Sequence, residues 1–205
     1  PYTGEGAMGI GKPLKSILHM NPDIPIWLGT GMESTVKLTA EIADGWLPLG
    51  LVPETYEIYE PWIEAGLEKA GKNRSDFEAF SGTSVIVTDD VQSALNRPKP
   101  GIALYVGGMG HKDKNFHKEM MIRRGFGEAA EQIQELYLAK RKEEAAAAVP
   151  DEFVDQGALI GDKARIARRF RDWEDSGITG MTISGNEEAM RLMADVARLN
   201  VDPNA

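Results

Sequence analysis

The chain has 205 residues, with 32 acidic against 23 basic side chains and a net charge of −9 at pH 7. This balance argues against a nucleic-acid partner, because a phosphate backbone selects clustered Lys and Arg. Its apolar stretches are far shorter than the roughly 20 residues needed to cross a bilayer, so no membrane partner is expected. The absence of cysteine excludes disulfides, thiolate metal sites and thiol catalysis, and with the acidity it favours a cytoplasmic protein.

Four segments have the composition of β-strands, at residues 24–29, 45–49, within 77–88, and 181–184. Helical periodicity separates or follows them, at residues 33–43, 54–70, from a cap at Asp162 to about 176, and at 187–199. Gly71 ends the second of these helices, as glycine commonly does. Strands that alternate with helices predict parallel βαβ units.

One region breaks this alternation. Residues 95–150 contain no strand pattern and read as helical, including one long helix over about 128–148 whose alanine-rich end, 145–148, is interpreted as solvated. The sequence contains no internal repeat and no flexible linker. We therefore interpret this region as a helical insertion in a single domain covering residues 1–205. Four strands in this length suit either a small open sheet or the C-terminal half of a (β/α)8 barrel, which needs eight strands and about 250 residues.

The best candidate site is the segment LGTGMES, residues 28–34. Two glycines flank Thr30 between a strand and a helix, so the backbone can approach a ligand and the helix N-terminus can offer N–H groups to an anion. The hydroxyls of Thr30 and Ser34 are possible additional donors. The motif alone is weak, because it equally suits a simple tight turn and lacks both the lysine of a P-loop and the third glycine of a dinucleotide fingerprint.

Other chemically versatile residues are less informative. His111 and His117 are six positions apart, which is not the spacing of a helical metal pair, and no metal site is predicted. A solvated histidine is the favoured interpretation for both, with a general base at a cleft edge as the alternative, and His19 is expected in a loop. Trp46 is interpreted as a core or wall residue rather than a ligand-stacking one. Arg123 and Arg124 are interpreted as surface residues of a charged region, with an anion clamp as the alternative. A mixed-charge solvated face of one helix is expected to carry Arg165, Arg168, Arg169 and Arg171.

A family resemblance adds to these predictions. The segment IPIWLGTGMESTVKLTAEIADGWLPLG resembles the bacterial luciferase-like monooxygenase superfamily, in its F420-dependent oxidoreductase branch. Further matching segments are ALYVGGMG, RRGFGEAAEQIQELYLAKRKEEAAAAVPDE, GDKARIARRF and SGITGMTI. The resemblance covers nearly the whole chain and implies a TIM barrel of which strands 5–8 are present, with a helical insertion before the last strand. It also implies that the N-terminal half of the barrel is missing here.

The resemblance implies hydride transfer between coenzyme F420 and an organic substrate, in a protein that forms a homodimer. The turn after the fifth strand would cradle the cofactor phosphate, which assigns cofactor binding to Gly29, Thr30, Gly31, Met32 and Glu33. The Glu33 carboxylate should then point away from the phosphate. Residues 49–52 are apolar where some relatives place a cation for a sugar phosphate, which favours an apolar substrate.

No catalytic residue is assigned, because the proton-handling histidine of the family belongs to the missing half, and this chain alone is expected to be inactive. An FMN-dependent monooxygenase that uses oxygen is the alternative enzyme. A non-catalytic half-barrel scaffold is the alternative of a different class, although such a half would expose open sheet edges.

Overall fold

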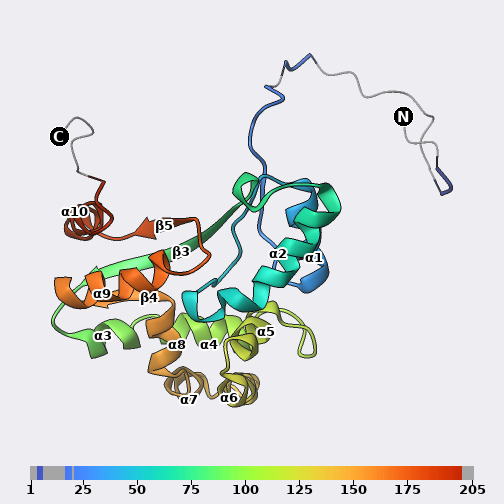
Figure 1. Cartoon of the computed structure of the whole chain (residues 1–205). Coiled ribbons are helices and arrows are strands. Elements are labelled where there is room, and N and C mark those ends of the chain that lie inside the picture. The colour runs from blue at the N-terminus through green and yellow to red at the C-terminus, as the bar shows by residue number, and fades with distance from the viewer. Residues whose placement is uncertain (1–3, 7–16, 20, 200–205) are drawn as a thin grey trace.

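The computed structural model describes residues 4–6, 17–19 and 21–199 (Figure 1). The strands are β1 (Trp27–Leu28), β2 (Gly45–Trp46), β3 (Glu78–Val87), β4 (Ala158–Gly161) and β5 (Gly180–Ser184). The helices are α1 (Glu33–Ile42), α2 (Tyr56–Ala70), α3 (Val91–Asn96), α4 (Lys99–Gly108), α5 (Phe116–Arg123), α6 (Gly127–Leu138), α7 (Lys142–Ala147), α8 (Asp151–Gln156), α9 (Lys163–Glu174) and α10 (Glu187–Val196), with short 3₁₀ helices at Pro53–Thr55 and Arg74–Asp76. Within the described ranges, no helix is long and apolar enough to span a membrane.

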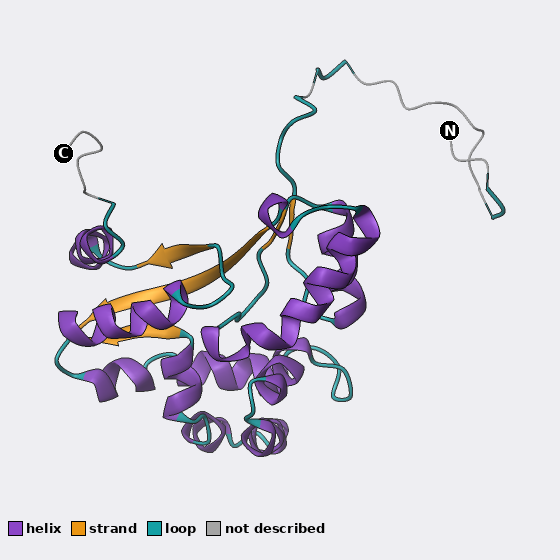
Figure 2. Ribbon diagram, viewed as in Figure 1, coloured by secondary structure: helices purple, strands orange, loops and turns teal. Residues whose placement is uncertain are grey.

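All five strands of the sheet are parallel, and β3 connects them. Its first residues pair with β2, its middle with β5 and its end with β4. Ser84 pairs with both Ala158 and Ser184, so β4 and β5 lie on opposite edges of β3 at that point. Figure 2 shows β3 as the longest strand, running from the region of α1 and α2 toward α3. The predicted parallel α/β sheet is therefore confirmed.

The sequence prediction of four strands is wrong in number, because it missed β4. Both faces of β4 are buried: Leu159 belongs to one hydrophobic core, while Ala158 and Ile160 belong to another. A short strand buried on both faces has no polar–apolar alternation to detect. The helical segment α3–α8 consequently lies between β3 and β4, and β5 follows only after β4 and α9.

Two hydrophobic cores meet along β3 and β4. The first packs α1, α2, α9 and α10 on the sheet, around Trp46, Ile166 and Trp173. The second lies among the helices α3–α8, around Met121, Ile133 and Phe153. Side chains of β4 alternate between these cores, so this strand joins the helical segment to the rest of the sheet.

The predicted long helix over 128–148 is also wrong, because the chain forms the hairpin of α6 and α7. Lys140 adopts the left-handed conformation with φ 64°, and the Arg141 N–H donates to the Leu136 carbonyl at 2.9 Å, which ends α6. Neither glycine nor proline marks this turn in the sequence. The hairpin brings Ala145 into the second core with no exposed surface, so the alanine-rich segment packs instead of facing solvent.

A cluster of ion pairs links α8 to α9. Both Asp155 carboxylate oxygens accept hydrogen bonds from Arg165 Nη2, at 2.8 and 2.7 Å. Arg169 contacts the same carboxylate and reaches Glu54 Oε1 at 3.5 Å, in the segment after β2. The expectation that these two arginines lie on a solvated face is therefore wrong, since both are half-buried and pair with carboxylates of other elements.

The contact between α1 and α2 requires a glycine, which gives a first prediction. A Cβ on Gly66 would lie 2.2 Å from the Lys37 carbonyl oxygen and 2.7 Å from the Ala40 Cβ. We expect Gly66→Ala to lower the free energy of unfolding by about 1–3 kcal/mol, because the helices must move apart. Urea denaturation followed by circular dichroism measures this change.

Gly101→Ala is the matched control, because Gly101 is also helical but a Cβ there has no atom within 4 Å. That substitution should raise stability by about 0.5–1 kcal/mol through the entropy of the unfolded chain. Equal effects of the two substitutions would contradict the packing argument.

Candidate functional site

The candidate site is the turn that joins β1 to α1. It follows the carboxyl end of a parallel strand, which is the edge where α/β sheets and barrels bind their ligands. Gly31 leaves open space beside the backbone, since a Cβ built there has no atom within 4 Å. Gly29 packs closely instead, because its Cβ would lie 3.3 Å from the Leu47 carbonyl oxygen. Gly31 is thus the position at which a ligand can approach the chain.

Unbonded backbone donors lie at the start of α1, directly after Gly31 in the chain. The Met32 carbonyl accepts hydrogen bonds from the N–H groups of Thr35 and Val36, at 3.0 and 2.8 Å. The N–H groups of Glu33 and Ser34 precede these bonds and have no acceptor among the described residues. Free donors at the positive end of a helix dipole favour an anion such as a phosphate. The Ser34 side chain is exposed at the same end.

Thr30 has a structural role that the sequence did not reveal. Its hydroxyl lies 2.8 Å from the Thr39 hydroxyl on α1, and its carbonyl accepts a hydrogen bond from Trp46 Nε1 at 2.9 Å. Trp46 is completely buried, which confirms it as a core residue. In this structure the Thr30 hydroxyl is directed toward the helix, and its role toward a ligand stays a prediction.

The side chain of Glu33 lies along the surface of α1. Its Oε1 accepts a hydrogen bond from Lys37 Nζ at 2.6 Å, one helical turn toward the C-terminus. The pair neutralises a carboxylate that would otherwise repel an anion at the helix start. Met32 occupies the N-cap position with a partly exposed side chain.

The apolar segment after β2 packs against the helical segment. Gly50 has φ +68°, and a Cβ there would lie 3.0 Å from Met120 Sδ on α5. Leu49 beside it is exposed, while Leu51 is buried and its carbonyl accepts a hydrogen bond from the Ser81 hydroxyl at 2.7 Å. The segment after β2 thus approaches α5 at Gly50 and leaves the apolar side chain of Leu49 exposed.

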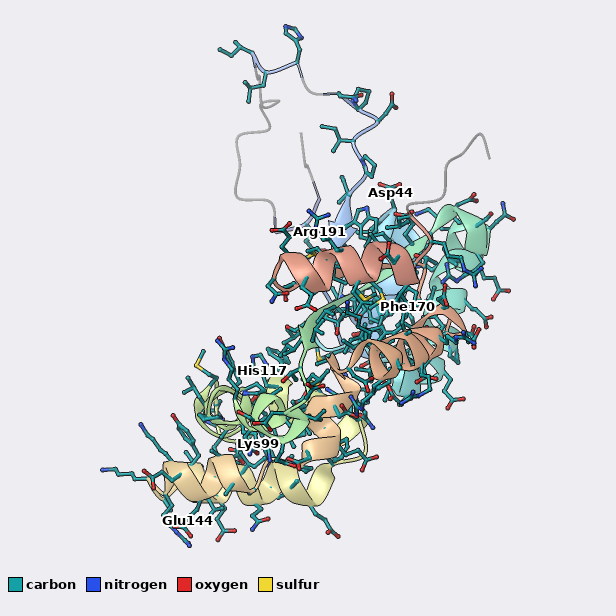
Figure 3. All side chains as sticks on the ribbon, turned by 90° about the vertical axis from the view of Figure 1, so that its left-hand side faces the viewer. Asp44, Lys99, His117, Glu144, Phe170 and Arg191 are labelled. Atoms are coloured by element: carbon teal, nitrogen blue, oxygen red, sulfur yellow. The ribbon has the colours of Figure 1, made fainter. Side chains whose placement is uncertain are left out.

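The histidines lie away from the turn or in solvent. His19 and His111 are exposed, whereas His117 on α5 is partly buried with its ring 4.7 Å from that of Tyr105. Burial lowers the pKa of His117 and so favours its neutral form. In Figure 3, His117 lies with Lys99 and Glu144 on the helical segment, apart from Asp44, Phe170 and Arg191. Among the described residues, no three His, Asp or Glu side chains are grouped to hold a metal ion.

Arg124 is buried, with only 8% of the residue exposed. The predicted surface position of this residue is therefore wrong. Its guanidinium lies 4.0 Å above the Phe153 ring, and Nη2 donates to the Phe153 carbonyl at 2.7 Å. Burial lowers the pKa of Arg124 to about 10, so the group remains charged at neutral pH. No sequence pattern marks this position, because burial here depends on how α5 packs on α8.

Two solved structures with the same fold are F420-dependent enzymes. The coenzyme F420-dependent tetrahydromethanopterin reductase from Methanopyrus kandleri superposes with a TM-score of 0.65 at 24% identity, over 83% of this chain and 49% of that one. An F420-dependent secondary alcohol dehydrogenase superposes with a TM-score of 0.63 at 16% identity, over 92% of this chain and 53% of that one. At these identities the likeness establishes the fold, a luciferase-like TIM barrel matched over about half its length.

Sequence relatives agree with this fold. A Mycobacterium tuberculosis protein assigned as a coenzyme F420-dependent oxidoreductase is 40% identical over 95% of this chain, which covers 57% of the relative. The 5,10-methylenetetrahydromethanopterin reductase of Archaeoglobus fulgidus is 27% identical over 76% of this chain and 46% of its own length. The chain thus spans about half the length of the curated relatives it matches. Residues 4–180 match the luciferase-like monooxygenase family, and the chain belongs to that family.

Proposed function

We propose that this chain forms part of an oxidoreductase that transfers a hydride between coenzyme F420 and an organic substrate. The observation that carries the proposal is the open backbone at Gly31 beside the free N–H groups of Glu33 and Ser34. These groups suit the phosphate of the cofactor. The relatives whose names specify F420 support this cofactor over others that carry a phosphate.

Each residue of the turn would contribute differently. Gly31 would admit the phosphate, and the N–H groups of α1 would bind it. Thr30 would hold the turn in place through its bonds to Trp46 and Thr39. When bound, F420 supplies the hydride chemistry, and the protein supplies position and electrostatics. None of the described residues is assigned as a catalytic acid or base.

The remaining parts of the proposal rest on other observations. The exposed side chain of Leu49 favours an apolar portion in the substrate. The family resemblance supports a homodimer and a companion N-terminal half of the barrel, and the composition supports a cytoplasmic location. An FMN-dependent monooxygenase is the second candidate, favoured by the description of the family itself.

A titration of the full-length gene product with F420 and with FMN separates these candidates. We expect F420 to bind at least about tenfold more tightly, measured by fluorescence at equilibrium. Tighter binding of FMN would instead support the oxygen-using monooxygenase. Binding of neither would leave the fold assigned and contradict both functions.

Gly31→Asp tests the proposed phosphate site. Beyond its two chain neighbours, no described residue lies within 4 Å of a Cβ at Gly31, so the variant should fold normally. The new carboxylate would occupy the open space and repel a phosphate, and we expect F420 affinity to fall by at least about tenfold. Unchanged affinity would exclude this turn as the phosphate site.

Thr30→Val is the matched control at the neighbouring position. It removes the hydroxyl bond to Thr39 while retaining the carbonyl that accepts from Trp46. We expect a loss of about 0.5–1.5 kcal/mol in the free energy of unfolding, with F420 affinity changed less than about twofold. A large loss of affinity without a loss of stability would assign the Thr30 hydroxyl to the ligand instead.

A further inference from the structure

A cavity lies between the sheet and the helical segment, with a volume of about 540 Å³. Its walls come from β3, β4, the residues at the end of β5, and the helices α3, α4 and α8. Ser84 and Ser184 line the sheet side, and their hydroxyls lie 3.1 Å apart. Most of the remaining wall is apolar, including Ile102, Phe153 and Ile160. This volume is within the range of about 300–1,000 Å³ that small organic ligands require.

The charges on this cavity are all of one sign. Arg97 and Arg124 line it, and none of the described residues in its wall is acidic. The Arg97 backbone N–H donates to the Ser93 carbonyl at 3.2 Å, and its side chain, which is exposed, makes no ion pair or hydrogen bond with another described residue. The buried Arg124 and the exposed Arg97 place positive charge beside a mostly apolar wall, and this combination favours an anion.

Arg124 is the more informative of the two. Its Nε and Nη2 atoms donate to Gln156 Oε1 at 3.3 and 3.0 Å, and Nη2 also donates to a backbone carbonyl, so its partners are neutral. Its Nη1 atom has no acceptor among the described residues and faces the position of a Cβ on Gly157, 3.7 Å away, in the cavity wall. Glu54 is the acidic residue whose charge raises the pKa of Arg124, and it is itself paired with Arg169. A buried guanidinium without a carboxylate is costly unless a ligand supplies one.

We propose that this cavity binds the carboxylate of an amphipathic organic acid, with Arg124 and Arg97 holding the carboxylate and the apolar wall holding the hydrocarbon. The inference rests on the proposed function, because the cavity lies toward the carboxyl ends of β3 and β5, where a barrel holds its substrate. It narrows the substrate from an apolar molecule to one that carries an anionic group. The two serine hydroxyls provide further donors beside it.

Octanoate, 1-octanol and octylammonium test the proposal, because they share a chain length and differ in charge. Isothermal titration calorimetry with the full-length gene product should give an affinity for octanoate at least about tenfold higher than for octanol, and no measurable binding of octylammonium. Arg97→Gln should weaken octanoate binding about tenfold while leaving octanol unaffected. Arg124→Gln should also weaken octanoate binding about tenfold. If Arg124→Gln fails to fold, the Arg97→Gln variant still tests the proposal.

Arg168→Gln is the matched control, since Arg168 is an exposed arginine on α9 outside the cavity wall. It should leave octanoate affinity unchanged. Equal affinities for octanoate and octanol, or unchanged octanoate binding in Arg97→Gln, would overturn the proposal. F420 binding is measured separately on the same protein, so failure of the carboxylate site and failure of the proposed cofactor are distinguished.

Discussion

The hydrogen-bond ladder of β3 is the constraint on which the structure depends. This ten-residue strand pairs with β2 at its start, β5 along its middle and β4 at its end, so every other strand reaches the sheet through it. Its neighbours are short, and β1 and β2 have only two residues each. Short strands cannot form a stable sheet alone, because few ladder bonds offset the entropy of ordering them. The long strand supplies the template that aligns their carboxyl ends.

Alignment of those ends is what creates the candidate site. Two hydrogen bonds fix the turn after β1. The Trp46 indole on the neighbouring strand donates to the Thr30 carbonyl, and the Thr39 hydroxyl on α1 bonds to the Thr30 hydroxyl. These bonds leave Gly31 and the first N–H groups of the helix free, so rigid packing on one side of the turn produces an open binding surface on the other.

The helical segment completes this edge of the sheet. It leaves the sheet after β3 and returns at β4, whose side chains alternate between the two cores, and Asp155 is fixed by Arg165 and Arg169. The segment is therefore docked by both hydrophobic packing and paired charges. Within the segment Arg124 is buried against Phe153, and the docked segment forms the cavity wall near the ends of β3 and β5. The proposed cofactor site, in the turn after β1, and the proposed substrate cavity, against the helical segment, would then lie at the same edge of the sheet.

Local pattern alone determined the parallel α/β class, the helices capped by Asp162 and ended by Gly71, and the glycine turn at residues 29–31, because each depends on neighbours in the chain. Other features depend on contacts between distant residues, and only the tertiary structure decided these. Strand β4 has no alternation because two cores bury it, and α6 ends at Lys140 because α7 packs back on the second core. The inward direction of the Thr30 hydroxyl and the burial of Arg124 follow from partners 9 and 29 positions away, Thr39 and Phe153. Local periodicity cannot encode such pairings, since they arise only when separate elements pack together.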